Sequence, residues 1–139
     1  MNSYINYDWY RNTSMGGFQN MNLYPPKEGY EKGNLFNDLY SQYKNYRPAS
    51  LKPINEQEKK LYELSAIAFA AHELNLYLDL HPSDQSMLAL FNDYRRKSND
   101  LIKEYEERFG PLSVSSNSME GKNTFTWEEE AWPWEGRNV

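Results

Sequence analysis

Two long segments with helical periodicity, separated by only four residues, constrain the fold of this chain more than any other feature. In the first segment, mostly apolar residues recur at steps of three and four: Leu61, Leu64, Ile67 or Ala68, Ala71, Leu74 or Asn75, and Leu78. The second segment carries a heptad-like series: Met87, Phe91, Tyr94, Ser98, Leu101, Tyr105 and Phe109. Such spacings place side chains on one face of a helix. The sequence therefore predicts two helices of roughly 25 residues, each about 37 Å long.

Local signals define the outer ends of these two helices. Asn55 is a favourable N-cap, and Glu58 three positions later completes a capping-box pattern. Gly110 followed by Pro111 is a strong signal for the end of the second helix. We therefore expect one helical unit between residues 54 and 112.

The connection between the helices is the run His81-Pro82-Ser83-Asp84. Proline disfavours helical backbone at the residue before it, so the first helix should end at His81. Ser83 or Asp84 can cap the next helix. A connection this short predicts that the two helices fold back on each other as an antiparallel hairpin.

The chain outside the hairpin has a different character. Residues 1–53 are rich in Asn, Tyr, Gly and Pro and are predicted to be largely irregular. One short helical turn is expected between residues 27 and 46, broken at Gly29 and Gly33. Its expected apolar face comprises Leu35, Phe36, Leu39, Tyr40 and Tyr43. Residues 113–139 form an acidic tail, so the predicted fold is all-α: a two-helix hairpin, a largely irregular N-terminal segment and an extended Trp-rich tail.

A lone hairpin is a weak solution to the burial of apolar surface. Each buried large apolar side chain contributes about 1.5–3 kcal/mol, whereas ordering the backbone costs about 1–2 kcal/mol per residue. The first helix also has apolar residues on more than one face, including Phe69, Leu76 and Leu80. We therefore expect a cover for it: the N-terminal turn, the tail, a second copy of the chain or another protein.

Composition excludes several classes of protein. The net charge of -5 and the pI near 5.1 argue against a general nucleic-acid-binding protein, which needs a basic face. Without cysteine, neither disulfides nor thiolate metal sites can form. No apolar run approaches the roughly 20 residues that span a bilayer, and the N-terminus lacks the pattern of a signal peptide. Membrane insertion and secretion are not expected.

The sequence predicts no catalytic, cofactor or metal site. The chain has only two histidines, His72 and His81, and neither has the spacing of a metal-binding pair. Neighbouring positions on a helix point in different directions, so His72 and Glu73 are not expected to act together. The sequence lacks a phosphate-binding loop and a nucleophile elbow, and the charged groups 95–97 and 104–107 are interpreted as solvated faces of a helix. We do not expect an enzyme.

Three of the four tryptophans lie within residues 127–134 of the acidic tail. Disordered tails are usually poor in aromatic residues, so Trp127, Trp132 and Trp134 indicate docking. Either the rings fold back onto the hairpin, with Pro133 holding two of them in extended geometry, or they are anchors for a partner, because tryptophan is enriched at interface hot spots. The sequence leaves both alternatives open.

Three motifs together carry a resemblance to a known family. They are the run Glu73-Leu74-Asn75-Leu76-Tyr77-Leu78-Asp79-Leu80-His81-Pro82-Ser83-Asp84, the end Tyr105-Glu106-Glu107-Arg108-Phe109-Gly110-Pro111-Leu112, and Trp127 with Trp132-Pro133-Trp134-Glu135. As an ordered set, over Leu61–Glu135, these motifs resemble the CotJB family of bacterial spore coat proteins. The chain departs from the family at Phe109, where tyrosine is frequent, and in the acidic run 128–130.

A second, weaker resemblance covers about Phe18–Tyr43. The stretch Lys32-Gly33-Asn34-Leu35-Phe36-Asn37-Asp38-Leu39-Tyr40, with Tyr43 following, is similar to the companion coat protein CotJA. Three positions, Asn34, Asn37 and Gln42, depart from the family's Thr, Pro and Pro. The similarity implies that one chain supplies two coat components.

The CotJB resemblance implies a non-catalytic structural component of the endospore coat, made in the mother-cell cytoplasm. It implies as partners other spore coat proteins, a CotJC-like manganese catalase and a CotJA-like protein, with a homo-oligomer left open. The partner-binding hypothesis names six residues: Trp127, Trp132, Pro133, Trp134, Tyr77 and Leu76. The alternative is an accessory subunit that supports the partner's metal site through His72 or Glu73. A third and weaker idea is tyrosine cross-linking, since eight of 12 tyrosines precede Pro48.

Overall fold

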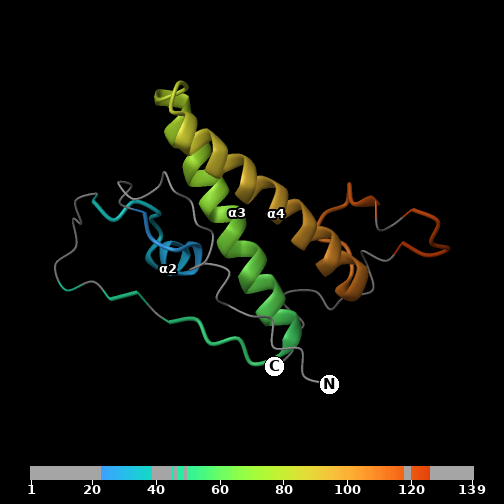
Figure 1. Ribbon diagram of the computed structural model, residues 1–139. Helices are drawn as coiled ribbons and strands as arrows, with labels where there is room; N and C mark the ends of the chain where they lie inside the picture. Colours follow the sequence, from blue (N-terminus) through green and yellow to red (C-terminus); the bar gives the residue numbers. More distant parts are fainter. Residues whose placement is uncertain (1–22, 39–44, 46, 49, 118–119, 126–139) are drawn as a thin grey trace, which may run out of the picture.

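In the part of the chain that the structure describes, two long helices pack side by side and one short helix lies beside them (Figure 1). The computed structural model describes residues 23–38, 45, 47–48, 50–117 and 120–125. In order along the chain, the helices are α2 (Pro26–Lys32), α3 (Glu56–Leu80) and α4 (Gln85–Phe109). Within the described ranges there is no β-strand, only an isolated antiparallel bridge between Leu23 and Phe36. The all-α prediction is thus confirmed for this part of the chain.

The ends of α3 and α4 lie where the capping residues predict them. The Asn55 side chain accepts a hydrogen bond from the Glu58 backbone N–H at 2.8 Å, and Glu58 in turn accepts one from the Ile54 N–H at 2.8 Å. Asp84 caps α4 through the Met87 N–H at 3.1 Å, and Gly110 follows the last residue of α4. These bonds satisfy backbone donors that a helix start otherwise leaves unpaired.

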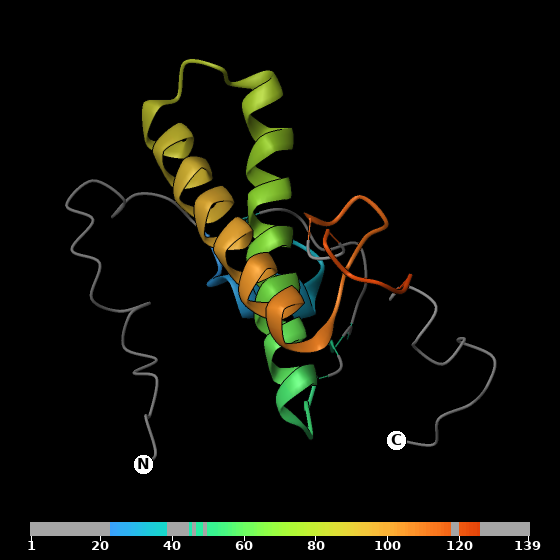
Figure 2. The ribbon, with the colours of Figure 1, turned by 90° about the vertical axis from the view of Figure 1, so that its right-hand side faces the viewer.

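The helices α3 and α4 run in opposite directions and are joined at one end by residues 81–84 (Figure 2). Small residues of α3 are buried, namely Ala66, Ala70 and Ala71, and Ala70 shares a buried cluster with Met87 and Leu90 of α4. One cluster of buried residues comprises Leu64, Ile67 and Leu101. The end away from the connection is held by polar pairs: Gln57 with Tyr105 at 3.1 Å, Lys60 with Glu104 at 2.6 Å and Glu56 with Arg108 at 3.2 Å.

The short helix α2 differs from the predicted turn. The helix spans Pro26–Lys32 and includes Gly29, which was expected to break it. It ends at Gly33, whose φ of 72° lies in the left-handed region that glycine adopts without steric cost. Leu35 and Phe36 therefore follow the helix and do not lie on one face of it. The other members of that predicted face, residues 39–43, lie outside the described residues.

Leu35 is the residue through which this N-terminal segment enters the core. It is 0% exposed and belongs to a buried cluster with Ala70 and Leu74 of α3 and Met87 and Leu90 of α4. Gly29 is buried beside it, and a Cβ at that position would lie 3.3 Å from Leu35 atoms. The N-terminal segment thus covers one side of the helix pair, which is one of the covers that the sequence left open.

Figure 1 shows that α2 and the segment after α4 lie on opposite sides of the helix pair. Among the described residues, no helix is both long enough and apolar enough to cross a membrane.

We expect Leu35→Ala to destabilise the fold by about 2–4 kcal/mol, because it removes a fully buried side chain and leaves a cavity between α3 and α4. Urea unfolding followed by circular dichroism measures the change. The matched control is Leu80→Ala, since Leu80 is 80% exposed and its truncation should shift stability by no more than about 0.5 kcal/mol. Equal effects of the two substitutions would show that Leu35 is not a core residue.

Candidate interaction surface

The end of the molecule at the connection between α3 and α4 is organised around Tyr77. Its ring stacks on Phe36 at 5.5 Å between centroids and lies 4.4 Å from the His81 ring. The Tyr77 hydroxyl donates a hydrogen bond to Asp84 at 3.0 Å. Asp84 also caps α4 through Met87. One side chain of α3 thus contacts the N-terminal segment, the connection and the start of α4.

The same contacts determine the ionisation of the Asp84 carboxyl and the Tyr77 hydroxyl. The pKa of Asp84 is lowered, chiefly by the hydrogen bond from the Met87 N–H and also by the bond from the Tyr77 hydroxyl, because both favour the ionised carboxylate. The pKa of Tyr77 is raised, since its hydroxyl donates to Asp84 and would lose that bond on ionisation. The ionised Asp84 and the neutral Tyr77 therefore stabilise each other.

Apolar side chains project outward beside this network. Leu76 is 49% exposed and Leu80 is 80% exposed, and their spacing of four places them on one face of α3. His81 and Pro82 are exposed next to them. We call Leu76, Leu80, His81 and Pro82 the turn-end surface. Its backbone is fixed from within by the contacts of Tyr77, so it presents a preformed apolar edge.

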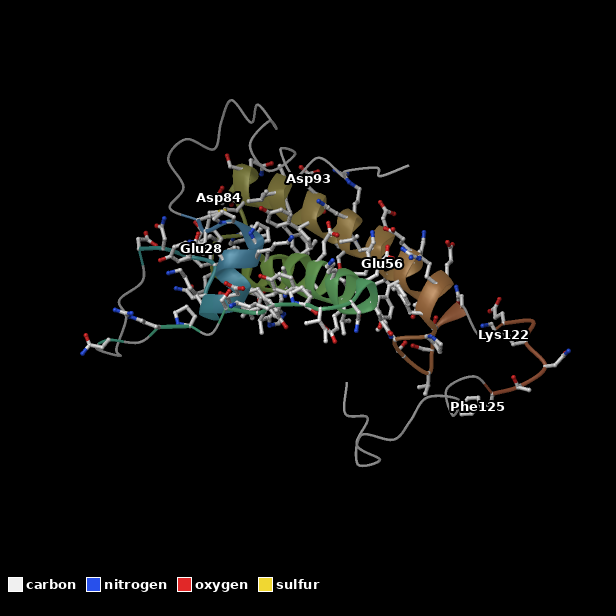
Figure 3. The ribbon with its side chains drawn as sticks, turned by 90° about the horizontal axis from the view of Figure 1, so that it is seen from below. Glu28, Glu56, Asp84, Asp93, Lys122 and Phe125 are labelled. Atoms are coloured by element: carbon white, nitrogen blue, oxygen red, sulfur yellow. The ribbon has the colours of Figure 1, made fainter. Side chains whose placement is uncertain are left out.

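The predicted partner-binding residues do not gather in one place within the described chain. Leu76 belongs to the turn-end surface, whereas Tyr77 is engaged in internal contacts. Trp127, Trp132, Pro133 and Trp134 lie outside the described residues. The last described residue before them, Phe125, is 59% exposed. Figure 3 shows Phe125 and Lys122 at the opposite end of the molecule from Asp84.

Glu106 has a role that sequence reasoning missed, because the group 104–107 was interpreted as a solvated face. Glu106 accepts a hydrogen bond from the Leu112 N–H at 2.9 Å and another from the Ser116 hydroxyl at 2.6 Å. It thereby fixes the path of the chain as it leaves α4. The apolar side chains exposed on that path are Leu112 and Val114. The signal that could have revealed this role is the position of Glu106 one turn before a Gly-Pro stop.

The two residues considered for a metal site have different surroundings. His72 is exposed on α3. Glu73 accepts a hydrogen bond from the Leu35 N–H at 3.4 Å, so its carboxylate faces the N-terminal segment. Within the part of the chain that the structure describes, no group of three His, Cys, Asp or Glu residues could hold a metal ion.

Comparison with known proteins gives one positive result. The family model described as CotJB protein matches residues 58–135. The match includes α3 from Glu58 onward, all of α4 and the turn-end surface, but not α2 or Leu35. No curated protein and no solved structure matches the chain. The similarity of the N-terminal segment to CotJA stays a prediction.

We expect Asp84→Asn to make the protein less sensitive to acid. The folded-state pKa of Asp84 is below the ordinary value of 3.8, so its contribution to stability is complete above that value and is lost as the pH falls through the lowered pKa. Asparagine keeps the cap but does not titrate. Urea midpoints between pH 7 and pH 2 should therefore fall less for the variant than for the wild type.

The control for that experiment is Asp100→Asn, because Asp100 is exposed on α4. Parallel acid profiles for the wild type and Asp84→Asn would contradict the role assigned to the Asp84 carboxylate.

Proposed function

This chain belongs to the CotJB protein family, and on that premise we propose that it is a non-catalytic structural component of the endospore coat that serves as an assembly partner of a manganese-catalase-like coat protein of the CotJC type. The family is one of spore coat proteins and implies localisation to the coat and other coat proteins as neighbours. The specific partner is our proposal and rests on the resemblance described above.

The observation that carries the proposal is the match over residues 58–135 together with the form of the matched region. That region contains two long helices joined by polar pairs such as Lys60–Glu104 and Glu56–Arg108. It also exposes large apolar residues at the turn end. Such residues on a rigid helix are suited to bury surface against another protein.

We propose that the turn-end surface is the part of the described chain that contacts the catalase-like partner. Leu76 and Leu80 can insert into an apolar depression of the partner without rearrangement, because Tyr77 and Asp84 already fix the backbone beneath them. Trp127, Trp132 and Trp134, with Pro133 between the last two, provide the second set of anchors in this proposal. Phe125, the last described residue before this second set, lies at the opposite end of the molecule from Asp84 (Figure 3).

An accessory role in the partner's metal site is the second candidate function. The observation that favours it is the exposure of His72 on α3, which leaves its imidazole accessible to a neighbouring protein. Glu73 is the weaker candidate, because its carboxylate accepts the Leu35 N–H. His72→Ala separates the two functions. Loss of metal from the partner with normal assembly supports the accessory role, whereas normal metal content with normal assembly leaves the structural role alone.

We expect the double substitution Leu76→Asp and Leu80→Asp to abolish capture of the catalase-like partner, because burying two carboxylates against an apolar surface is unfavourable. Co-purification of the two proteins after co-expression measures this effect. The matched control is Leu51→Asp with Ile54→Asp, since these residues are 47% and 71% exposed but lie before α3. The helical circular dichroism of both variants should match the wild type.

Equal capture by the turn-end variant and the wild type would exclude the turn-end surface as the partner site. The same experiment with Trp132→Ala and Trp134→Ala tests the tail independently. Loss of coat incorporation with intact activity of the partner supports the structural role. If the turn-end variant and the tail variant both keep coat incorporation and partner activity, the structural role is contradicted.

A further inference from the structure

Residues 23–36 form a self-contained unit, which we call the N-terminal turn unit. After α2, the Asn34 N–H donates to the Gly29 carbonyl at 3.0 Å and the Gly33 N–H to the Tyr30 carbonyl at 3.2 Å. These two bonds are the pairing that closes a helix end through a left-handed glycine. The Tyr24 N–H donates to the Leu35 carbonyl at 2.8 Å, which joins the two ends of the unit.

The tip of the unit is fixed by Asn34. Its side-chain amide donates to the Phe36 carbonyl at 2.6 Å, and its side-chain oxygen accepts the Phe36 N–H at 3.0 Å. Leu35, between them, is held out from the turn. The hydrogen bonds within the unit therefore present a leucine followed by an aromatic ring at its tip.

The helices α3 and α4 receive this tip in a groove that we call the leucine groove, lined by Ala70, Leu74, Met87 and Leu90. Leu35 is fully buried there, with an exposure of 0%. The Phe36 ring stacks on Tyr77 at the rim, and Glu73 accepts the Leu35 N–H. These contacts resemble the recognition of a peptide, in which pockets for side chains and one polar contact to the backbone define the ligand.

Further contacts surround this anchor. Tyr30 of α2 lies 5.9 Å from the ring of Phe69 and 6.0 Å from that of Tyr62. The Tyr62 hydroxyl donates a hydrogen bond to Glu31 at 2.9 Å. Burial and this hydrogen bond raise the pKa of Tyr62 to about 12. The N-terminal turn unit thus meets α3 along more than one helical turn.

The groove and its ligand belong to separable parts of the chain. The groove lies wholly inside the region that matches the CotJB family, residues 58–135, and the N-terminal turn unit lies wholly outside it. Residues 37–55 connect them and could span up to about 60 Å when extended. That distance exceeds the roughly 37 Å length of α3. The covalent connection therefore does not oblige the unit to occupy the groove of its own chain.

We propose that the leucine groove is a recognition site for the N-terminal turn unit, filled by the chain's own unit in a single molecule and by the unit of a second copy when copies are concentrated. Every copy carries both the groove and a preformed ligand for it. Exchange of an identical element between copies forms the same contacts in the dimer as in the monomer, so it adds no new interface. This inference does not depend on the identity of the coat partner.

The first test measures binding in the full-length chain. Leu35→Asp removes the native occupant, because a carboxylate is not tolerated in an apolar groove. We expect a fluorescently labelled peptide of residues 23–38 to bind this variant saturably. Intact wild type should bind the same peptide at least about tenfold more weakly, since its groove is already occupied, and the peptide with Leu35→Ala should show a similar loss.

A second variant is needed in case Leu35→Asp does not fold. Gly33→Val disturbs the unit at its left-handed position, with φ of 72°, and a Cβ there has no neighbour within 4 Å. The residues that line the leucine groove are unchanged in Gly33→Val, so we expect this variant also to bind the peptide. Failure of a helical Leu35→Asp or Gly33→Val chain to bind the peptide would overturn the recognition site.

The second test asks whether the ligand can come from another copy, and it uses the absence of cysteine from the chain. Full-length Phe36→Cys and Tyr77→Cys are unfolded together in urea, refolded at increasing concentration and oxidised. We expect a disulfide-linked heterodimer, identified by mass spectrometry, whose yield rises with concentration. Phe36→Cys mixed with Leu80→Cys is the matched control, because Leu80 faces solvent.

The double variant Phe36→Cys with Tyr77→Cys in one chain shows that the two positions can be bridged. If it forms the internal disulfide while the mixture gives no more heterodimer than the control, the unit stays in its own chain and the exchange is excluded. Should the internal bridge fail, the wild type is refolded at the same concentrations. Light scattering must then find a dimer that Leu35→Asp does not form, and its absence overturns the exchange.

Discussion

Burial of Leu35 between α3 and α4 is the contact on which the remaining structure depends. Two helices in contact share one seam, and that seam cannot cover an apolar surface that extends around the first helix. Leu35 brings a third element to the pair and joins Ala70 and Leu74 to Met87 and Leu90 in one buried cluster. Phe36 then covers Tyr77, and Tyr77 in turn holds the cap of α4 through Asp84. The N-terminal segment, the connection and the second helix are thus linked through one leucine.

The sequence predicts those parts of the fold that depend on neighbouring residues. Asn55, Asp84 and Gly110 act within one turn of their own position, so their effect on the helix ends can be derived without knowledge of tertiary contacts. The site of Leu35 could not be derived in this way, since the other buried members of its cluster are at least 35 positions away in the chain. Of the two breaks predicted in the turn over 27–46, the one at Gly33 is confirmed, because the left-handed backbone there ends α2, whereas Gly29 lies within the helix.

The candidate site shows the same division. Leu76 is exposed, and its role as a partner-binding residue stays a prediction. Tyr77, in the same motif, makes internal contacts instead. Its ring packs on Phe36, which is distant in sequence, and its hydroxyl bonds to Asp84, which is seven residues away. Glu106 was missed because a carboxylate in a charged run is usually solvated, and the only local signal that it binds a backbone N–H six residues later is its position one turn before a Gly-Pro stop. Which side chain of a charged helix is engaged depends on how the following chain turns back.

The arrangement of the two ends has a mechanical consequence. The turn-end surface and the exposed residues Leu112, Val114 and Phe125 lie at opposite ends of helices about 37 Å long. The interior between them is held by apolar clusters and by polar pairs across α3 and α4, so the two ends keep a fixed separation. Under the proposal that both ends bind other proteins, one small neighbour cannot cover both ends, and two neighbours can bind without competing. In a layered shell, such a part would act as a rigid spacer that sets the distance between the proteins it joins.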